Sequence, residues 1–129
     1  MKKNYLIVLA NYYKNISNGL LKSAIDTLPK SSSIKIIKVP GVFEIPVTIS
    51  KNIKKYDAFL ALGCVIKGKT PHFDFISQAS TSAIMQLSTK NKKPIGNGII
   101  TCLNMKQAII RKSKGREAAQ AIISVLSQK

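Results

Sequence analysis

The fold is decided by residues 58–75, which read AFLALGCVIKGKTPHFDF. The run from Ala58 to Gly63 is apolar throughout, as is typical of a strand that is buried on both faces of a parallel sheet. A polar, cationic loop follows and ends at Pro71 and His72, the only histidine of the chain. A helical pattern then begins, and we expect this helix to start at Asp74. In open α/β sheets, the functional residues lie in loops of this kind. We therefore interpret the rest of the chain as the scaffold that positions this loop.

Strands and helices alternate on both sides of this stretch. Apolar runs predict four strands, at residues 5–11, 34–39, 58–63 and 95–101, the last of them interrupted by Gly96, Asn97 and Gly98. Helices are predicted from a cap at Ser17 or Asn18 to Pro29, from Pro46 to Tyr56, from Asp74 to about residue 89, from a cap at Asn104 to Arg111, and from Gly115 to about residue 127. This order predicts a single domain, residues 1–129, of the α/β class: a three-layer α/β/α, flavodoxin-like fold with a four-stranded parallel sheet and helices on both faces.

The chain is strongly basic, with 21 Lys plus Arg against 5 Asp plus Glu and a net charge of +16. Such a charge points first to an anionic partner such as nucleic acid. However, nearly all of the cations are lysines scattered over every segment, and the arginines and interleaved aromatic residues of nucleic-acid-binding surfaces are lacking. We therefore interpret the lysines as solvated surface residues and predict no nucleic-acid partner. The charge is compatible with attraction of a small phosphorylated substrate.

Targeting and redox signals predict a cytoplasmic protein. No apolar run approaches the roughly 20 residues that span a bilayer, so no membrane partner is expected. The start of the chain is similar in outline to a signal peptide, but its apolar run is short and polar Asn11 follows it. Cys64 and Cys102 lack metal-ligand spacing, and two thiols without a secretion signal indicate a reducing compartment. No metal is predicted.

Polar residues follow each predicted strand, and parallel strands bring the loops after them to one edge of the sheet. We expect Tyr12, Phe43, Glu44, residues 64–72 and Asn97 to converge there. The single histidine in this set lies in a polar loop and not on an apolar face. It is therefore interpreted as a proton carrier near neutral pH.

A phosphate site is suggested by residues 67–70, which offer two ammonium groups, a hydroxyl and backbone donors, although not with the spacing of a Walker loop. Arg111 can bind phosphate through two parallel hydrogen bonds. Glu44 either interacts with its helix dipole or accepts hydrogen bonds from a flat heterocycle stacked on Phe43 or Tyr12. From the residues alone, we infer an enzyme that acts on a small phosphorylated substrate and a planar ring.

Three blocks of the sequence resemble the lumazine synthase family, transferases of the penultimate step of riboflavin biosynthesis. They are VPGVFEIP at 39–46, LGCVIKGKTPHFD at 62–74, and PI and GIIT within 94–101 with Gln107, Ala108 and Arg111 behind them. The resemblance extends over about Leu6 to Val125. It implies condensation of 5-amino-6-(D-ribitylamino)uracil with 3,4-dihydroxy-2-butanone 4-phosphate to 6,7-dimethyl-8-ribityllumazine, with release of phosphate and water. It implies no cofactor and no metal.

The same resemblance implies roles for individual residues. The pyrimidine and its ribityl chain are held by Tyr12, Val42, Phe43, Glu44, Cys64, Val65, Ile66 and Asn97, the last of these from a neighbouring subunit. The butanone phosphate is bound by Lys69, Thr70 and Arg111. His72 matches the histidine that transfers protons.

The sequence departs from the family pattern at four points. Lys67 replaces a common arginine, Asn97 replaces a common phenylalanine, the link from Arg111 to Gly115 is short, and an N-terminal strand that reaches a neighbouring subunit is absent. The family's base unit is a pentamer with sites between subunits, so we expect a homopentamer and not a 60-subunit shell. The alternative function is a catalytically weak relative that binds flavin-like ligands.

Overall fold

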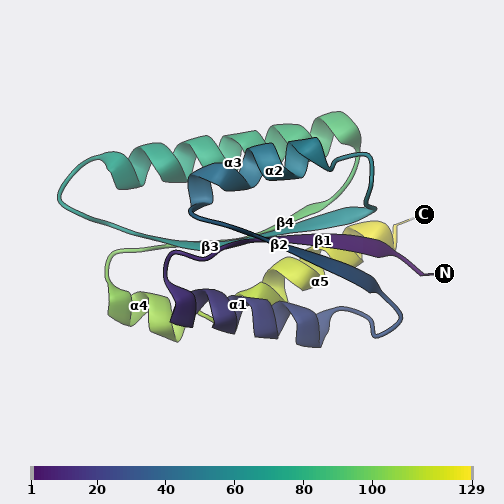
Figure 1. Cartoon of the computed structure of the whole chain (residues 1–129), viewed down its shortest axis with the longest axis horizontal. Helices are drawn as coiled ribbons and strands as arrows, with labels where there is room; N and C mark the ends of the chain where they lie inside the picture. Colours follow the sequence, from purple (N-terminus) through teal and green to yellow (C-terminus); the bar gives the residue numbers. More distant parts are fainter. Residues whose placement is uncertain (1, 129) are drawn as a thin grey trace.

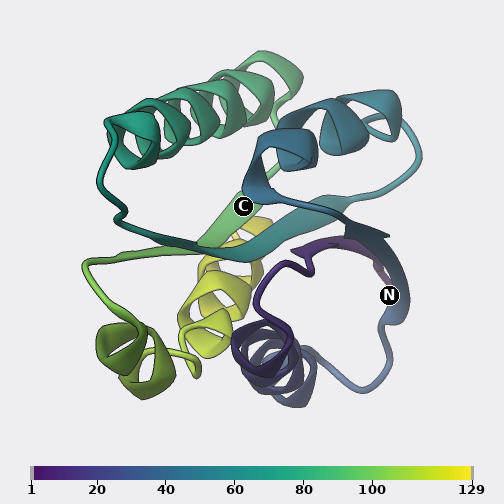
Figure 2. The same ribbon diagram turned by 60° about the vertical axis from the view of Figure 1, so that its left-hand side comes forward.

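A computed structural model describes residues 2–128 as a parallel sheet between two layers of helices (Figure 1). The strands are β1 (Asn4–Ala10), β2 (Ser33–Val39), β3 (Ala58–Ile66) and β4 (Ile95–Cys102), in the order β2-β1-β3-β4. One face of the sheet is covered by α2 (Ile45–Lys51) and α3 (His72–Asn91), and the other by α1 (Lys14–Thr27), α4 (Met105–Ile110) and α5 (Gly115–Leu126), as Figures 1 and 2 show. The predicted three-layer, flavodoxin-like fold is confirmed.

Burial explains the apolar runs of the two central strands. In β1 every residue after Asn4 is buried, and in β3 the first seven residues are buried. Both faces of these strands are covered by helices, so neither face needs polar residues. Alternate side chains enter two cores: Ile7 packs on the side of α1 and α5, and Leu6 packs on the side of α2 and α3. The edge strand β4 alternates instead, with Asn97 among its exposed positions.

Helix α1 begins earlier than predicted, at Lys14, so Ser17 and Asn18 lie inside the helix and neither caps it. The fully buried Ser17 hydroxyl donates a hydrogen bond to the carbonyl of Ala10 at 2.6 Å and so ties the helix to the end of β1. The predicted extension of the next helix to Tyr56 is also wrong, because α2 ends at Lys51.

The central stretch is more regular than predicted. Strand β3 continues past Gly63 to Ile66 because its last residues pair with the equally extended β4. Helix α3 begins at His72 and not at Asp74, since the carbonyl of Pro71 already accepts the N–H of Asp74 at 3.0 Å. The histidine is therefore positioned by the first turn of a helix, and the cationic loop is shorter than expected.

A reciprocal cap begins α4, as the sequence predicted for Asn104. The Asn104 side chain accepts the N–H of Gln107 at 2.9 Å, and the Gln107 side chain accepts the N–H of Leu103 at 2.8 Å. We expect Asn104→Ala to lower the free energy of unfolding by about 1 kcal/mol, because it leaves a helix N–H unpaired. Urea denaturation measures this loss. Asn104→Asp keeps an acceptor and should retain wild-type stability; equal destabilisation by both variants would contradict the cap.

Candidate active site

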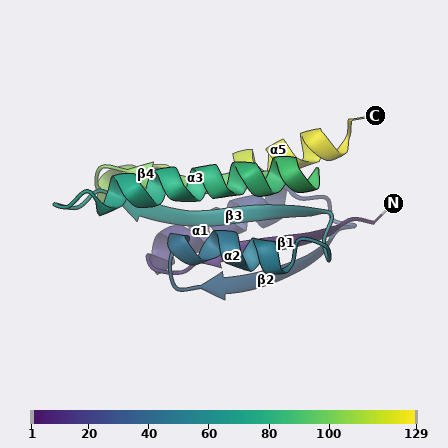
Figure 3. The same ribbon diagram turned by 90° about the horizontal axis from the view of Figure 1, so that it is seen from above.

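A cleft of about 570 Å³ lies at the carboxyl ends of β1, β2 and β3. This is the edge from which the loop between β3 and α3 extends, at the left of Figures 1 and 3. From β1 the chain first adds β2 on one side and then crosses back to add β3 on the other side. Ligand sites of open α/β sheets usually lie at such a reversal of strand order. Of the predicted site residues, the cleft is lined by Tyr12, Val42, Phe43, Glu44, Cys64, Val65, Ile66 and His72.

Two aromatic rings give the cleft open, flat surfaces. The side chain of Tyr12, after β1, is 74% exposed, and that of Phe43, after β2, is 68% exposed. Aromatic rings of this size normally bury most of their surface, and exposed rings in a cleft offer stacking area to a planar ligand. The pair suits a heterocyclic substrate.

Glu44 stabilises the start of a helix with one carboxylate oxygen and leaves the other without a partner among the described residues. One carboxylate oxygen, Oε1, accepts the N–H of Gly41 at 3.0 Å and stabilises the short 3₁₀ turn Val42–Glu44 that leads into α2. Within residues 2–128 the second oxygen, Oε2, forms no hydrogen bond or ion pair. It is free to accept a hydrogen bond from a ligand in the cleft.

The end of β3 contributes backbone groups. The ladder between β1 and β3 ends at Leu62, whereas β3 continues to Ile66 on the side of β4. In the part of the chain that the structure describes, the backbone groups from Cys64 onward on the side of β1 therefore have no strand partner, and residues 64–66 line the cleft. They offer a ligand peptide donors and acceptors in a fixed, extended geometry.

The Cys64 thiol is unsuited to nucleophilic chemistry. Burial, followed by the neighbouring Cys102 thiol, raises the pKa of Cys64 to about 12, and the opposing effect of Arg111 is smaller. A thiol with this pKa stays protonated at neutral pH, and the thiolate is the reactive form. Cys64 thus shapes the cleft without supplying a nucleophile.

His72 stands where the cleft meets the cationic loop. Its backbone N–H donates to the Thr70 hydroxyl at 3.4 Å, and its exposed side chain lines the cleft. Lys69 and Thr70 are exposed and lie outside the cleft lining, next to the N-terminus of α3. A helix N-terminus carries partial positive charge, which the lysine increases. The end of the cleft near His72 is therefore the one suited to an anion.

Arg111 lies apart from the cleft lining but at the same edge of the sheet. Its Nη1 donates to the carbonyl of Thr101 at 3.0 Å and lies 3.8 Å from the sulfur of Cys102. Both contacts hold the guanidinium at the carboxyl end of β4, the strand beside β3. Among residues 2–128, the other guanidinium nitrogens form no hydrogen bond or ion pair, so they can bind an anion.

The expectation that Asn97 converges on this edge is wrong. Asn97 pairs with Ala61 midway along β4, and its side chain accepts the N–H of Ile99 at 3.1 Å. The prediction took Gly96 and Gly98 as an interruption of the strand, but the ladder continues through both to Cys102. Asn97 is therefore remote from the cleft of its own subunit, and its role across a subunit boundary remains a prediction.

Three residues line the cleft without having been assigned a role: Tyr13, Gly41 and Ile76. Gly41 lay within a quoted block. Ile76 follows His72 by four residues, a spacing that puts both on one face of a helix. Tyr13 had only its position beside Tyr12 as a signal. Burial, followed by the neighbouring Tyr12 and Cys64, raises the pKa of the Tyr13 phenol.

Among the described residues, no group of three or more His, Cys, Asp and Glu side chains could hold a metal ion. No helix in this part of the chain has the length and apolar character needed to cross a membrane. The lining of the cleft combines aliphatic and aromatic side chains with one carboxylate and one imidazole.

Comparison with known proteins agrees with the three sequence blocks. A family model described as 6,7-dimethyl-8-ribityllumazine synthase matches residues 2–129. Proteins of that name from Bartonella tribocorum and Bartonella henselae are 42% and 44% identical, covering 99% of this chain and 91% and 89% of their own. The Buchnera aphidicola protein of that name is 40% identical, over 98% of this chain and 87% of its own. The chain therefore belongs to the 6,7-dimethyl-8-ribityllumazine synthase family, a family of transferases.

Proposed function

We propose that this protein condenses 5-amino-6-(D-ribitylamino)uracil with 3,4-dihydroxy-2-butanone 4-phosphate to 6,7-dimethyl-8-ribityllumazine, releasing phosphate and water. The proposal rests above all on the cleft, where exposed aromatic rings, a free carboxylate oxygen and the single histidine lie together. Family membership supports a role in riboflavin biosynthesis. The two buried, free cysteines support a cytoplasmic location, where thiols stay reduced.

The proposed pyrimidine site uses the aromatic part of the cleft. The uracil ring stacks on Tyr12 and Phe43. Both side chains are largely exposed and add little to the core. The free oxygen of Glu44 accepts a hydrogen bond from the ring or from the ribityl chain. Val42 provides an apolar contact. The backbone groups of residues 64–66 that lie on the side of β1 bind the polar edge of the ring.

The proposed phosphate site uses the cationic end of the cleft. Lys69, Thr70 and the N-terminus of α3 bind the phosphate of the butanone, and Arg111 approaches from the end of β4. Fixed positive groups there stabilise the departing phosphate in the transition state. His72 lies between this end and the aromatic part. It transfers protons during dehydration of the carbinolamine and loss of phosphate.

In this scheme no side chain of the protein forms a covalent bond with a substrate. The 5-amino group of the pyrimidine attacks the ketone carbonyl, and loss of water gives an imine. Phosphate is then eliminated, and the ribitylamino nitrogen attacks the remaining carbonyl carbon and closes the second ring with loss of a second water. Each of these steps needs proton transfers only. Alignment of two bound substrates can by itself supply a large part of the acceleration. The scheme needs neither a cofactor nor a metal.

We further propose that the active unit is a homopentamer with sites between subunits. Asn97 lies on the exposed side of edge strand β4, remote from its own cleft, where a neighbouring copy can be reached. Next to the cleft, an apolar groove of about 420 Å³ runs between α2 and α3, and Val47 in it is 58% exposed. Light scattering should give a mass of five times 14.1 kDa. A monomeric mass at assay concentration would contradict the proposal.

The decisive assay mixes purified protein with both substrates and follows the fluorescent lumazine. We expect formation well above the uncatalysed background. Absence of turnover, together with tight binding of a ribityl-bearing flavin-like ligand, would favour the catalytically weak relative instead. If neither turnover nor ligand binding were observed, both proposed functions would be excluded.

We expect Arg111→Ala to raise the KM for the phosphorylated ketone by about ten- to a hundredfold, since a hydrogen bond to a charged group contributes roughly 1.5–3 kcal/mol. The KM for the pyrimidine should stay close to that of the wild type. Steady-state kinetics with each substrate varied in turn measures both. Arg116→Ala is the matched control, because Arg116 is exposed on α5 and lines no part of the cleft. An equal rise in both KM values would show that Arg111 does not bind the phosphate of the ketone specifically.

A further inference from the structure

We propose that Tyr13 is a positioning residue, which braces the ring of Tyr12 so that it presents an open face to the heterocyclic substrate. The inference rests on the proposed function and adds to it a residue outside the predicted site. Tyr13 and Tyr12 both line the cleft. Their ring centroids are 4.8 Å apart and their planes are inclined at 83°, an edge-to-face pair.

The two rings differ in how they are held. Tyr12 is 74% exposed, so little of its surface contacts the rest of the fold. Tyr13 is partly buried and packs against the core on the side of α1 and α5. An exposed side chain that turns freely about its χ1 angle loses that freedom when a ligand stacks on it. A fixed aromatic neighbour reduces this loss, so the buried ring is suited to hold the exposed one.

The backbone around the pair is fixed at both ends. The N–H of Asn11 donates to the carbonyl of Val39 at 2.9 Å, which joins the end of β1 to β2. The carbonyl of Tyr13 accepts the N–H of Ser17 at 2.9 Å, which starts α1. Tyr12 lies in the bend between these anchors. Its orientation therefore depends on its side-chain neighbour more than on the backbone.

The geometry of the pair leaves stacking surface free. In an edge-to-face pair, one ring edge meets one ring face, so at least one face of Tyr12 remains open in either arrangement. The partly buried phenol of Tyr13 has a raised pKa and stays neutral at physiological pH. The brace is thus an uncharged aromatic contact that does not change with pH near neutrality.

Tyr13→Leu tests the brace, because leucine keeps the apolar packing against the core and removes the ring edge. We expect the KM for the ribitylaminouracil to rise roughly two- to tenfold, the range of aromatic pair interactions, while the KM for the phosphorylated ketone stays unchanged. Tyr13→Phe keeps the ring and should restore the wild-type KM. Equal impairment by both variants, or equal rises in both KM values, would overturn the proposal.

A double-mutant cycle separates bracing from direct contact. In a Tyr12→Ala background there is no ring left to brace, so Tyr13→Leu should add no further loss of pyrimidine affinity. Fully additive losses would overturn the proposal. Quenching of substrate fluorescence measures pyrimidine binding without turnover. If the wild type bound the pyrimidine but formed no lumazine, the proposed function would fail while the brace could still be judged.

Discussion

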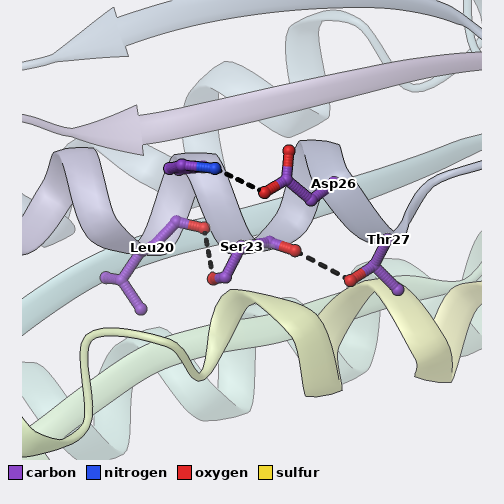
Figure 4. A network of polar contacts seen from close by, with 5 residues as sticks. Leu20, Ser23, Asp26 and Thr27 are labelled. Carbon is purple, nitrogen blue, oxygen red and sulfur yellow. Dashed lines mark hydrogen bonds and ion pairs between the residues drawn. The ribbon is translucent and has the colours of Figure 1, made fainter.

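Gly115→Ala is expected to lower the free energy of unfolding by about 1–3 kcal/mol or more, the range for overpacked sites. Gly115 is buried at the start of α5, where this helix crosses α1. A methyl group there would lie 2.0 Å from the carbonyl oxygen of Leu20 and 2.7 Å from the hydroxyl of Ser23. Figure 4 shows both groups on α1, with Ser23 donating to the same carbonyl at 3.0 Å. The carbonyl of Leu20 belongs to the backbone and cannot turn away as a flexible side chain can. Either α1 or α5 therefore has to move.

Gly19→Ala is the matched control. The nearest atoms to a methyl group on Gly19 would be the Cγ and Cδ of Lys112, both at 2.9 Å, and its Cβ at 3.0 Å. Cγ and Cδ can move with the side chain, whereas Cβ is fixed to the backbone, so the contact is milder than the one at Gly115. Gly19 also lies inside α1, where alanine is the better helix former by up to about 1 kcal/mol. We expect Gly19→Ala to destabilise the protein much less than Gly115→Ala in urea denaturation at equal protein concentration. Similar stabilities for the two variants would show that the helix crossing is looser than described.

The effect of Gly115→Ala should extend to the active site. Arg111 lies just before this helix in the chain, at the end of α4. A displaced α5 would pull on the short link between them and loosen the hydrogen bond from Arg111 to Thr101. We expect a higher KM for the phosphorylated ketone in the fraction that remains folded.

His72→Ala is expected to slow turnover by about ten- to a hundredfold, with smaller changes in the KM of either substrate. General acid–base catalysis by one side chain has a bounded effect, and substrate alignment in the cleft would survive the change. His72→Gln keeps hydrogen bonding but cannot carry a proton, so it should be impaired to a similar extent. Initial rates of lumazine formation with both substrates saturating measure this loss.

Gln78→Ala on the same helix is the control for this variant. Gln78 is exposed and lies on α3 beyond the cleft lining. Its replacement should leave turnover unchanged. Wild-type turnover in His72→Ala would remove the proton-transfer role, and full activity in His72→Gln would reassign it to hydrogen bonding.

The sequence by itself determined the class of fold and most of the cleft. The buried strands β1 and β3 appear as continuous apolar runs because helices cover both of their faces. Parallel strands deliver the residues after them to a common edge, so Tyr12, Phe43 and the end of β3 could be placed together before any coordinates. The three blocks identified the family, which the family model confirmed.

Only the tertiary structure decided where regular structure begins and ends. Ser17 looked like a cap, but its hydroxyl is used by the carbonyl of Ala10, a partner seven residues away that no local pattern reveals. Gly96 and Gly98 were expected to interrupt the fourth strand, but β4 continues through both of them. Its pairing with β3 uses backbone groups, which glycine has like any other residue. The brace by Tyr13 and the close contact at Gly115 likewise depend on distances between side chains and helices. Local sequence carries propensity and period, whereas contacts between distant segments are settled only when the chain packs.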